Sequence, residues 1–227
     1  MPLHLTVVLC VFDHLSFWEC MAKYELLSSN TIRTPDGRTL YRIRALRDFG
    51  NVNAGDIGGY VETAKNLAHH GLCWIFDDAR VFADGYVRAG ARIAGNAAVF
   101  DHARISDKAR IFGTARISGF AEILGTSSVF ENAQVSEHAT IIDSAQIHGH
   151  ARVDGYAKVW TGDIFGRAHL SGRVVVLGGP TIYRSHISEG VVDYDFKEVP
   201  ERHSTRPARR MRAMGIDQSG LKGGPAS

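Results

Sequence analysis

Val or Ile occupies every sixth position of the chain from Ile75 to Val159. The series has fifteen members, and a small residue follows each of the first fourteen four positions later. Twelve of these small residues are Ala, and the other two are Gly85 and Ser127. A period of six fits neither the turn of an α-helix nor a heptad, and a period held this strictly is typical of a repeat architecture.

A short strand followed by a corner accounts for the period of six. Alternate residues of a strand face the same side, and β-branched residues pack well there. Large side chains at both i and i+4 would collide inside a narrow tube, so i+4 is small. Asp, Asn and Gly at i+2 and i+3, as in Asp77-Asp78 and Gly95-Asn96, tolerate tight bends. Three such hexads are expected to close one triangular coil, with neighbouring coils about 4.8 Å apart.

This pattern resembles the hexapeptide-repeat family over residues 75 to 163. The resemblance implies a left-handed parallel β-helix. The left-handed sense comes from the resemblance alone, because parallel crossovers are ordinarily right-handed. The predicted fold is therefore all-β: a left-handed parallel β-helix with an N-terminal β-hairpin cap and a short, partly flexible C-terminal tail.

The boundaries of the predicted helix follow from breaks in the period. After Val159 the next aliphatic residue is Ile164, five positions on, which predicts one residue deleted within 160–163. Regular coils are expected over 75–163 and degenerate final coils over 164–192. Residues 57–74 are interpreted as an atypical first coil in which Ile57 fits the period and Thr63 and His69 do not, as terminal repeats are usually atypical.

The segment before the coils is expected to form a cap. In residues 21–56, two candidate strands flank the turn Pro35-Asp36-Gly37, which predicts a hairpin. Such a hairpin would block pairing at the open end of the helix. Residues 1–20 are expected to be an upstream extension without a role in the fold or a loosely docked element. A signal peptide is the weaker alternative, because no Lys or Arg precedes the apolar stretch Leu5–Phe12.

A narrower resemblance rests on Tyr41–Leu46, Gly55–Val61 and Cys73-Trp74, and it extends over residues 23 to about 160. These segments are similar to the YdcK-like acetyltransferases and their prophage-encoded relatives. The wider resemblance to hexapeptide-repeat enzymes implies acyl transfer from a CoA-type thioester to a small acceptor hydroxyl or amine. It implies acyl-CoA as a co-substrate, no tightly bound cofactor, a His as general base and a trimeric assembly.

The candidates for a general base are His102 and His138. Positions eighteen apart stack vertically, and one corner is expected to carry Asp84, His102, Phe120, His138 and Tyr156. His titrates near neutral pH, as a general base requires. The two histidines are expected to lie about 10 Å apart, too far to share a metal ion, and no metal site is predicted. His148, His150 and the pair His69-His70 are weaker candidates.

A non-catalytic structural or interaction protein, prophage-borne and using the face of the β-helix as a binding surface, remains the alternative. The strict hexads contain no insertion, whereas hexapeptide acyltransferases commonly carry a long loop at the active site. The sequence also has no Gly-rich phosphate loop and no residues recognisable as cofactor-binding. The acceptor, the donor and the host process are not specified by the sequence.

Outward positions predict apolar ladders and an interface. Phe112 and Phe130 fall on one face, and Leu124, Ile142 and Trp160 fall on another, on successive coils. Contiguous apolar surface of this kind normally marks an interface. We expect either a homotrimer or a monomer that covers these residues with its own segment after Val191.

Charge and cysteine content bound the partners and the compartment. The net charge is +2, and the predicted basic tail, 193–227, has six basic and two acidic residues from Pro200 onward, a net of +4. An acidic partner is the expected ligand of this tail, and nucleic acid is not expected. Three widely spaced cysteines predict a reducing, cytoplasmic location. No apolar run is long enough to cross a membrane.

Overall fold

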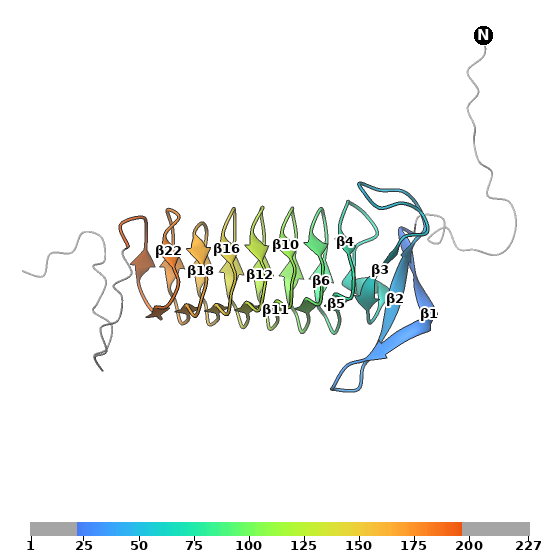
Figure 1. The fold of residues 1–227 in the computed structure, drawn as a ribbon, viewed down its shortest axis with the longest axis horizontal. Coiled ribbons are helices and arrows are strands. Elements are labelled where there is room, and N and C mark those ends of the chain that lie inside the picture. Colours follow the sequence, from blue (N-terminus) through green and yellow to red (C-terminus); the bar gives the residue numbers. More distant parts are fainter. Residues whose placement is uncertain (1–21, 197–227) are drawn as a thin grey trace, which may run out of the picture.

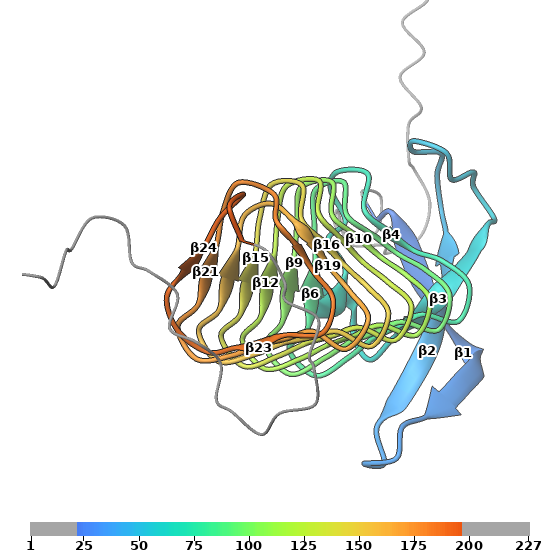
Figure 2. The ribbon, with the colours of Figure 1, turned by 60° about the vertical axis from the view of Figure 1, so that its left-hand side comes forward.

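The computed structural model describes residues 22–196 and shows a parallel β-solenoid. Short strands stack along the long axis into three faces, and the stacked strands within each face run parallel. An antiparallel hairpin lies at the N-terminal end (Figure 1). The turned view shows the faces enclosing a triangular interior (Figure 2). The predicted all-β solenoid with its hairpin is confirmed, while the left-handed winding stays an implication of the resemblance.

Three sheets form the faces of the solenoid. Face 1 contains β3 (Ile57–Val61), β5 (Arg80–Val81), β8 (Ala98–Val99), β11 (Arg116–Ile117), β14 (Gln134–Val135), β17 (Arg152–Val153), β20 (His169–Leu170) and β23 (His186–Ile187). Face 2 contains β4 (Trp74–Ile75), β7 (Arg92–Ile93), β10 (Arg110–Ile111), β13 (Ser128–Val129), β16 (Gln146–Ile147), β19 (Asp163–Ile164) and β22 (Thr181–Ile182). Face 3 contains β6 (Tyr86–Val87), β9 (Arg104–Ile105), β12 (Glu122–Ile123), β15 (Thr140–Ile141), β18 (Lys158–Val159), β21 (Val175–Val176) and β24 (Val191–Val192).

The core consists of the two inward positions of each hexad. All fifteen aliphatic residues of the series Ile75 to Val159 are fully buried, and so are the Ala residues four positions after them. The i+2 residue of each hexad has positive φ, for example Asp77 at 53° and Gly95 at 68°. The corner therefore sits at i+2, where Gly and Asp tolerate this backbone conformation at low cost.

The predicted deletion after Val159 is confirmed by the strand register. Ile147 of β16 pairs with Ile164 of β19, seventeen residues on, whereas Ile111 pairs with Val129, eighteen residues on. The last coil shortens twice more, because Leu170 pairs with Ile187 and Val176 pairs with Val192. These two later deletions were not predicted.

The first coil differs from its predicted register. Its inward residues are Val61 and Leu67, which are fully buried and lie opposite Val81 and Val87. The prediction that Ile57 fits the period is wrong, because its side chain is 50% exposed. Eight residues separate Leu67 from Ile75, so counting back from Ile75 in sixes misses the register by two.

The hairpin extends face 1 beyond the first coil. Strand β1 (Tyr24–Arg33) pairs antiparallel with β2 (Thr39–Ala45), and β2 pairs antiparallel with β3. Strand β3 in turn pairs parallel with β5. The N-terminal edge of face 1 is therefore covered by the hairpin, which agrees with its predicted role as a cap.

Buried polar contacts fix the cap to the first coil. The fully buried Lys23 donates through Nζ to the carbonyl oxygen of Cys73 at 2.8 Å and contacts its Sγ at 3.2 Å. The Tyr24 hydroxyl donates to the carbonyl oxygens of Ala64 and Leu67, both at 2.9 Å. Burial lowers the pKa of Lys23 and raises that of Tyr24, because both groups lose solvation of their charged forms.

Candidate functional site

The predicted column on one corner forms as an aromatic stack. His102 stacks on Phe120 with ring centroids 4.7 Å apart, Phe120 on His138 at 5.0 Å, and His138 on Tyr156 at 4.8 Å. Phe120 therefore separates the two candidate bases. The structure places them along one edge of the solenoid and does not bring them into one site.

His102 has a carboxylate partner at the start of this column. Its Nδ1 lies 3.2 Å from Oδ2 of Asp84, one coil earlier at the same corner. A carboxylate in this position orients an imidazole and fixes its tautomer. Among residues 22–196 no carboxylate pairs with His138, whose ring contacts are those to Phe120 and Tyr156. His102 therefore has a carboxylate beside it that supports a role as general base, and His138 has none in the described range.

Asp84 also lines a cavity between the cap and the first coils, which we call the cap cavity. It has a volume of about 530 Å³. The hairpin contributes Arg38, and the first coil contributes Glu62, Thr63, and Lys65 and Asn66 of the short 3-10 helix η2 (Ala64–Asn66). The next coils contribute residues 83–86 and Arg104. The site is therefore assembled from segments far apart in the sequence, which explains why the hexad pattern did not reveal it.

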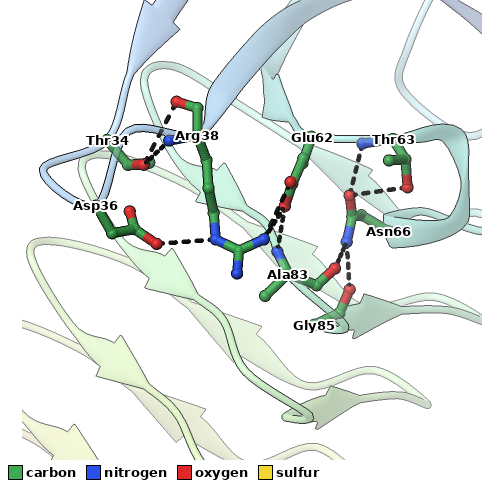
Figure 3. A network of polar contacts seen from close by, with 8 residues as sticks. All are labelled: Thr34, Asp36, Arg38, Glu62, Thr63, Asn66, Ala83 and Gly85. Atoms are coloured by element: carbon green, nitrogen blue, oxygen red, sulfur yellow. Dashed lines mark hydrogen bonds and ion pairs between the residues drawn. The ribbon is translucent and has the colours of Figure 1, made fainter.

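Figure 3 shows the polar network that holds the wall of the cap cavity. Arg38 donates from Nη1 to both oxygens of Glu62, at 3.0 and 3.1 Å, and from Nε to Asp36 at 2.8 Å. Glu62 also accepts the backbone N–H of Ala83 at 2.7 Å. Glu62 therefore ties the hairpin to the first corner of the solenoid.

Asn66 completes this network from the opposite side (Figure 3). Its Nδ2 donates to the carbonyl oxygens of Ala83 and Gly85, at 2.8 and 2.9 Å. Its Oδ1 accepts the backbone N–H of Thr63 at 2.8 Å, which closes a capping box around η2. The wall is thus held by satisfied hydrogen bonds on both sides and is preorganised.

The cap cavity is lined by three basic side chains, Arg38, Lys65 and Arg104, and two acidic ones, Glu62 and Asp84. Arg38 is neutralised by Asp36 and Glu62, and hydrogen bonds from Thr34 and Arg38 lower the pKa of Asp36. Lys65 and Arg104 form no ion pair with any residue in the described range 22–196. Cations of this kind can bind phosphate or carboxylate groups of a ligand.

Two further histidines pair with carboxylates near the C-terminal end. His148 lies 2.8 Å through Nε2 from Asp163, and its ring is stacked between Phe130 and Phe165. His169 lies 2.7 Å through Nε2 from Asp154. The sequence reasoning missed the pair His169–Asp154. Once the register is shifted by the deletion before Ile164, the pair becomes visible, because Arg152 then lies opposite His169 and Asp154 is the diagonal neighbour.

The residues predicted at an interface lie on the outer surface. Phe112 and Phe130 stack on each other at 4.8 Å within one ladder. Leu124 and Ile142 are half-buried, Trp160 is 42% exposed, and Leu177 on the next coil is also exposed. We call Leu124, Ile142, Trp160 and Leu177 the apolar stripe. Described residues up to 196 leave Trp160 uncovered, and the basic residues of the predicted tail lie outside the described range.

Across residues 22–196, no group of three or more His, Cys, Asp or Glu side chains is arranged to hold a metal ion. Within the same range, no helix has the length and apolar character required to span a bilayer. No model of a known protein family matches the chain, and no curated protein matches it in sequence.

Proposed function

We propose that the protein transfers an acyl group from a CoA-type thioester to the hydroxyl or amine of a small acceptor at the cap cavity. The observation that supports this most directly is the Asp84–His102 pair at the edge of the preorganised cap cavity, which Asp84 lines and His102 does not. The resemblance of the hexads to acyltransferases of the same repeat type adds to it. A donor with phosphate groups suits the unpaired Lys65 and Arg104.

The geometry suggests how His102 would act as general base. With Oδ2 of Asp84 3.2 Å from its Nδ1, the tautomer that carries the hydrogen on Nδ1 would leave Nε2 with a lone pair for the proton of the acceptor. The deprotonated acceptor would attack the thioester carbonyl carbon, forming the new ester or amide bond. The carbon–sulfur bond then breaks, and the CoA thiolate leaves and takes up the proton that His102 had accepted. Lys65 and Arg104 would hold the donor without taking part in the bond changes.

The test is the rate of thiol release from acetyl-CoA with a panel of small hydroxyl and amine acceptors. His102→Ala should lower the turnover by about 10²- to 10⁴-fold, the range for loss of a general base. Asp84→Asn should lower the turnover less, since Nε2 of His102 remains to accept the proton. His138→Ala is the matched comparison, because its ring stacks in the same column without a carboxylate. Equal losses for both histidines would point to the column's packing and contradict the assignment.

The second candidate is a non-catalytic interaction protein, and the uninterrupted solenoid surface favours it. Phe120 and Tyr156 are more than half exposed on one edge, and no loop interrupts residues 75–159. Titration calorimetry with acetyl-CoA separates the two candidates. Binding that weakens in Lys65→Gln and Arg104→Gln supports acyl transfer. No heat and no thermal shift at millimolar acetyl-CoA would favour the interaction protein.

A further inference from the structure

A second cavity, of about 360 Å³, lies near the C-terminal end of the solenoid and is lined by His150, Arg152, Arg167, Ala168 and His169. We call its two histidines and two arginines the basic cluster. His150 and Arg152 follow Ile147 by three and five residues, and Arg167 and His169 follow Ile164 by the same spacings. The cluster is therefore the same pair of outward positions on two neighbouring coils.

The backbone beneath the basic cluster is fixed on both coils. Arg152 and His169 lie opposite each other on β17 and β20. The N–H groups of His150 and Arg152 donate to the carbonyl oxygens of Gly166 and Ala168, at 2.8 and 2.9 Å. Coils of a sheet lie about 4.8 Å apart, so the four side chains converge on one small area.

The basic cluster lacks the countercharge that such crowding requires. No carboxylate lines the cavity, and neither Arg152 nor Arg167 forms an ion pair within residues 22–196. Asp154, which does not line the cavity, is bound to Nε2 of His169 at 2.7 Å. The equivalent positions one coil earlier carry the uncharged Asn132 and Gln134. Arg152 and Arg167 are therefore two positive charges on neighbouring coils without an ion-pair partner in the described range, and an anion between them would reduce their mutual repulsion.

We propose that the basic cluster binds the phosphoryl group of a small phosphorylated molecule. Two guanidinium groups can each donate two parallel hydrogen bonds to phosphate oxygens, and the imidazole of His150 adds a donor from the same side. Asp154 and the stack of His186 on His169, with ring centroids 4.4 Å apart, hold the His169 ring in place. The site lies several coils away from the cap cavity and does not rest on acyl transfer.

The experiment measures binding of inorganic phosphate to the full chain by titration calorimetry in a low-salt, phosphate-free buffer. Wild type should bind phosphate and show a raised melting temperature. Arg152→Gln and Arg167→Gln should each weaken binding by about tenfold or more, because each removes charge-assisted hydrogen bonds. Arg116→Gln is the matched control: it changes the same outward position on face 1, two coils before Arg152, and should leave binding within about twofold of wild type.

Melting curves without phosphate show whether the variants still fold. Arg152→Gln and Arg167→Gln should melt no lower than wild type, because they remove repulsion, yet lose the stabilisation by phosphate. Equal weakening by Arg116→Gln would overturn the proposal in favour of a diffuse surface effect. Absence of binding at millimolar phosphate would overturn it as well. If a single-stranded oligonucleotide binds and phosphate does not, the ligand of the basic cluster is a polyanion, and the proposal of a small phosphorylated molecule is overturned.

Discussion

At the scale of the residue, the corner position i+2 combines a steric cost with a means of offsetting it. Asp77, Asp101 and Asp107 have positive φ there, and each carboxylate accepts the backbone N–H of a Gly eighteen residues on, at 2.8 to 3.1 Å. An alanine at the same position has the strained backbone without this hydrogen bond. The left-handed conformation costs a non-glycine residue about 1–2 kcal/mol.

Ala89 and Ala91 provide a paired test of this account within one hexad. Ala89 has φ of 57°, whereas Ala91 is buried and has no positive φ. Ala89→Gly should raise the free energy of unfolding by about 0.5–1 kcal/mol, because strain is relieved. Ala91→Gly should lower the free energy of unfolding by about 1–2 kcal/mol, because a buried methyl group is lost and the unfolded chain gains backbone conformational entropy. Urea unfolding measures the free energies of unfolding of both variants. Changes of the same sign would contradict the backbone strain inferred at Ala89.

At the scale of the element, the sequence predicts a strand wherever the aliphatic and small positions recur together. The regular coils could be predicted because each hexad places a large Ile or Val and, in most cases, a small Ala at its two inward positions. This combination of a large and a small side chain fits the narrow interior of the tube. Val61 and Leu67 were missed because the step to Ile75 is eight residues, and no small residue follows Val61 at i+4. The deletions around Ile187 were missed because the final coil contains too few repeats to define a period.

The candidate site was predictable only in part, for a related reason. Asp84 and His102 stack because they are eighteen residues apart, so the regular period places them together. The wall of the cap cavity depends on Arg38 and Glu62, from two elements whose relative position no period sets. The pair His169–Asp154 depends on the register after a deletion. Periodicity therefore predicts contacts within the repeat, and contacts with irregular segments require the folded structure.

The cap should give the protein a measurable pH dependence through His69. Its ring stacks on Tyr24 at 4.4 Å, and its Nδ1 accepts the backbone N–H of Lys23 at 3.2 Å, so the folded cap needs the neutral form. Burial, assisted by the charges of Lys23 and Arg47, lowers the pKa of His69. The unfolded chain then binds the proton first, at a pH of about 6.5. The contribution of His69 is therefore fully present above that pH and is lost as the pH falls toward its folded pKa.

The difference between variants isolates this group from the other histidines. His69→Phe keeps the stack on Tyr24 but cannot titrate, so its unfolding free energy should fall less steeply than that of wild type between about pH 7.5 and 5. Chemical denaturation at several pH values gives both slopes. A His69→Phe slope equal to that of wild type would show that the cap tolerates the charged ring.

At the scale of the whole molecule, a solenoid stabilises itself through contacts between neighbouring coils, so its ends and its outer faces decide what it associates with. Strands β1 and β2 cover one N-terminal edge. The outer faces carry ring ladders that stack within the chain, such as Phe82 on Phe100 at 5.1 Å. The apolar stripe differs from these ladders, because three of its four members are aliphatic. Ring stacking therefore does not account for the stripe.

We predict that the apolar stripe is the seam of a homotrimer. Covering it would stabilise the assembly by several kcal/mol, at roughly 25 cal/mol per Å² of apolar surface. Ile142→Asp should convert a trimer to monomers, because it would bury an unpaired carboxylate. Ile57→Asp, at an exposed aliphatic residue outside the stripe, should leave the assembly intact. Sedimentation velocity measures the mass of each protein. A wild-type monomer would exclude the seam. In that case the melting temperature of Ile142→Asp would show whether residues beyond 196 cover the stripe. A lower melting temperature would mean that such a cover is lost, and an unchanged one would mean that the stripe is open.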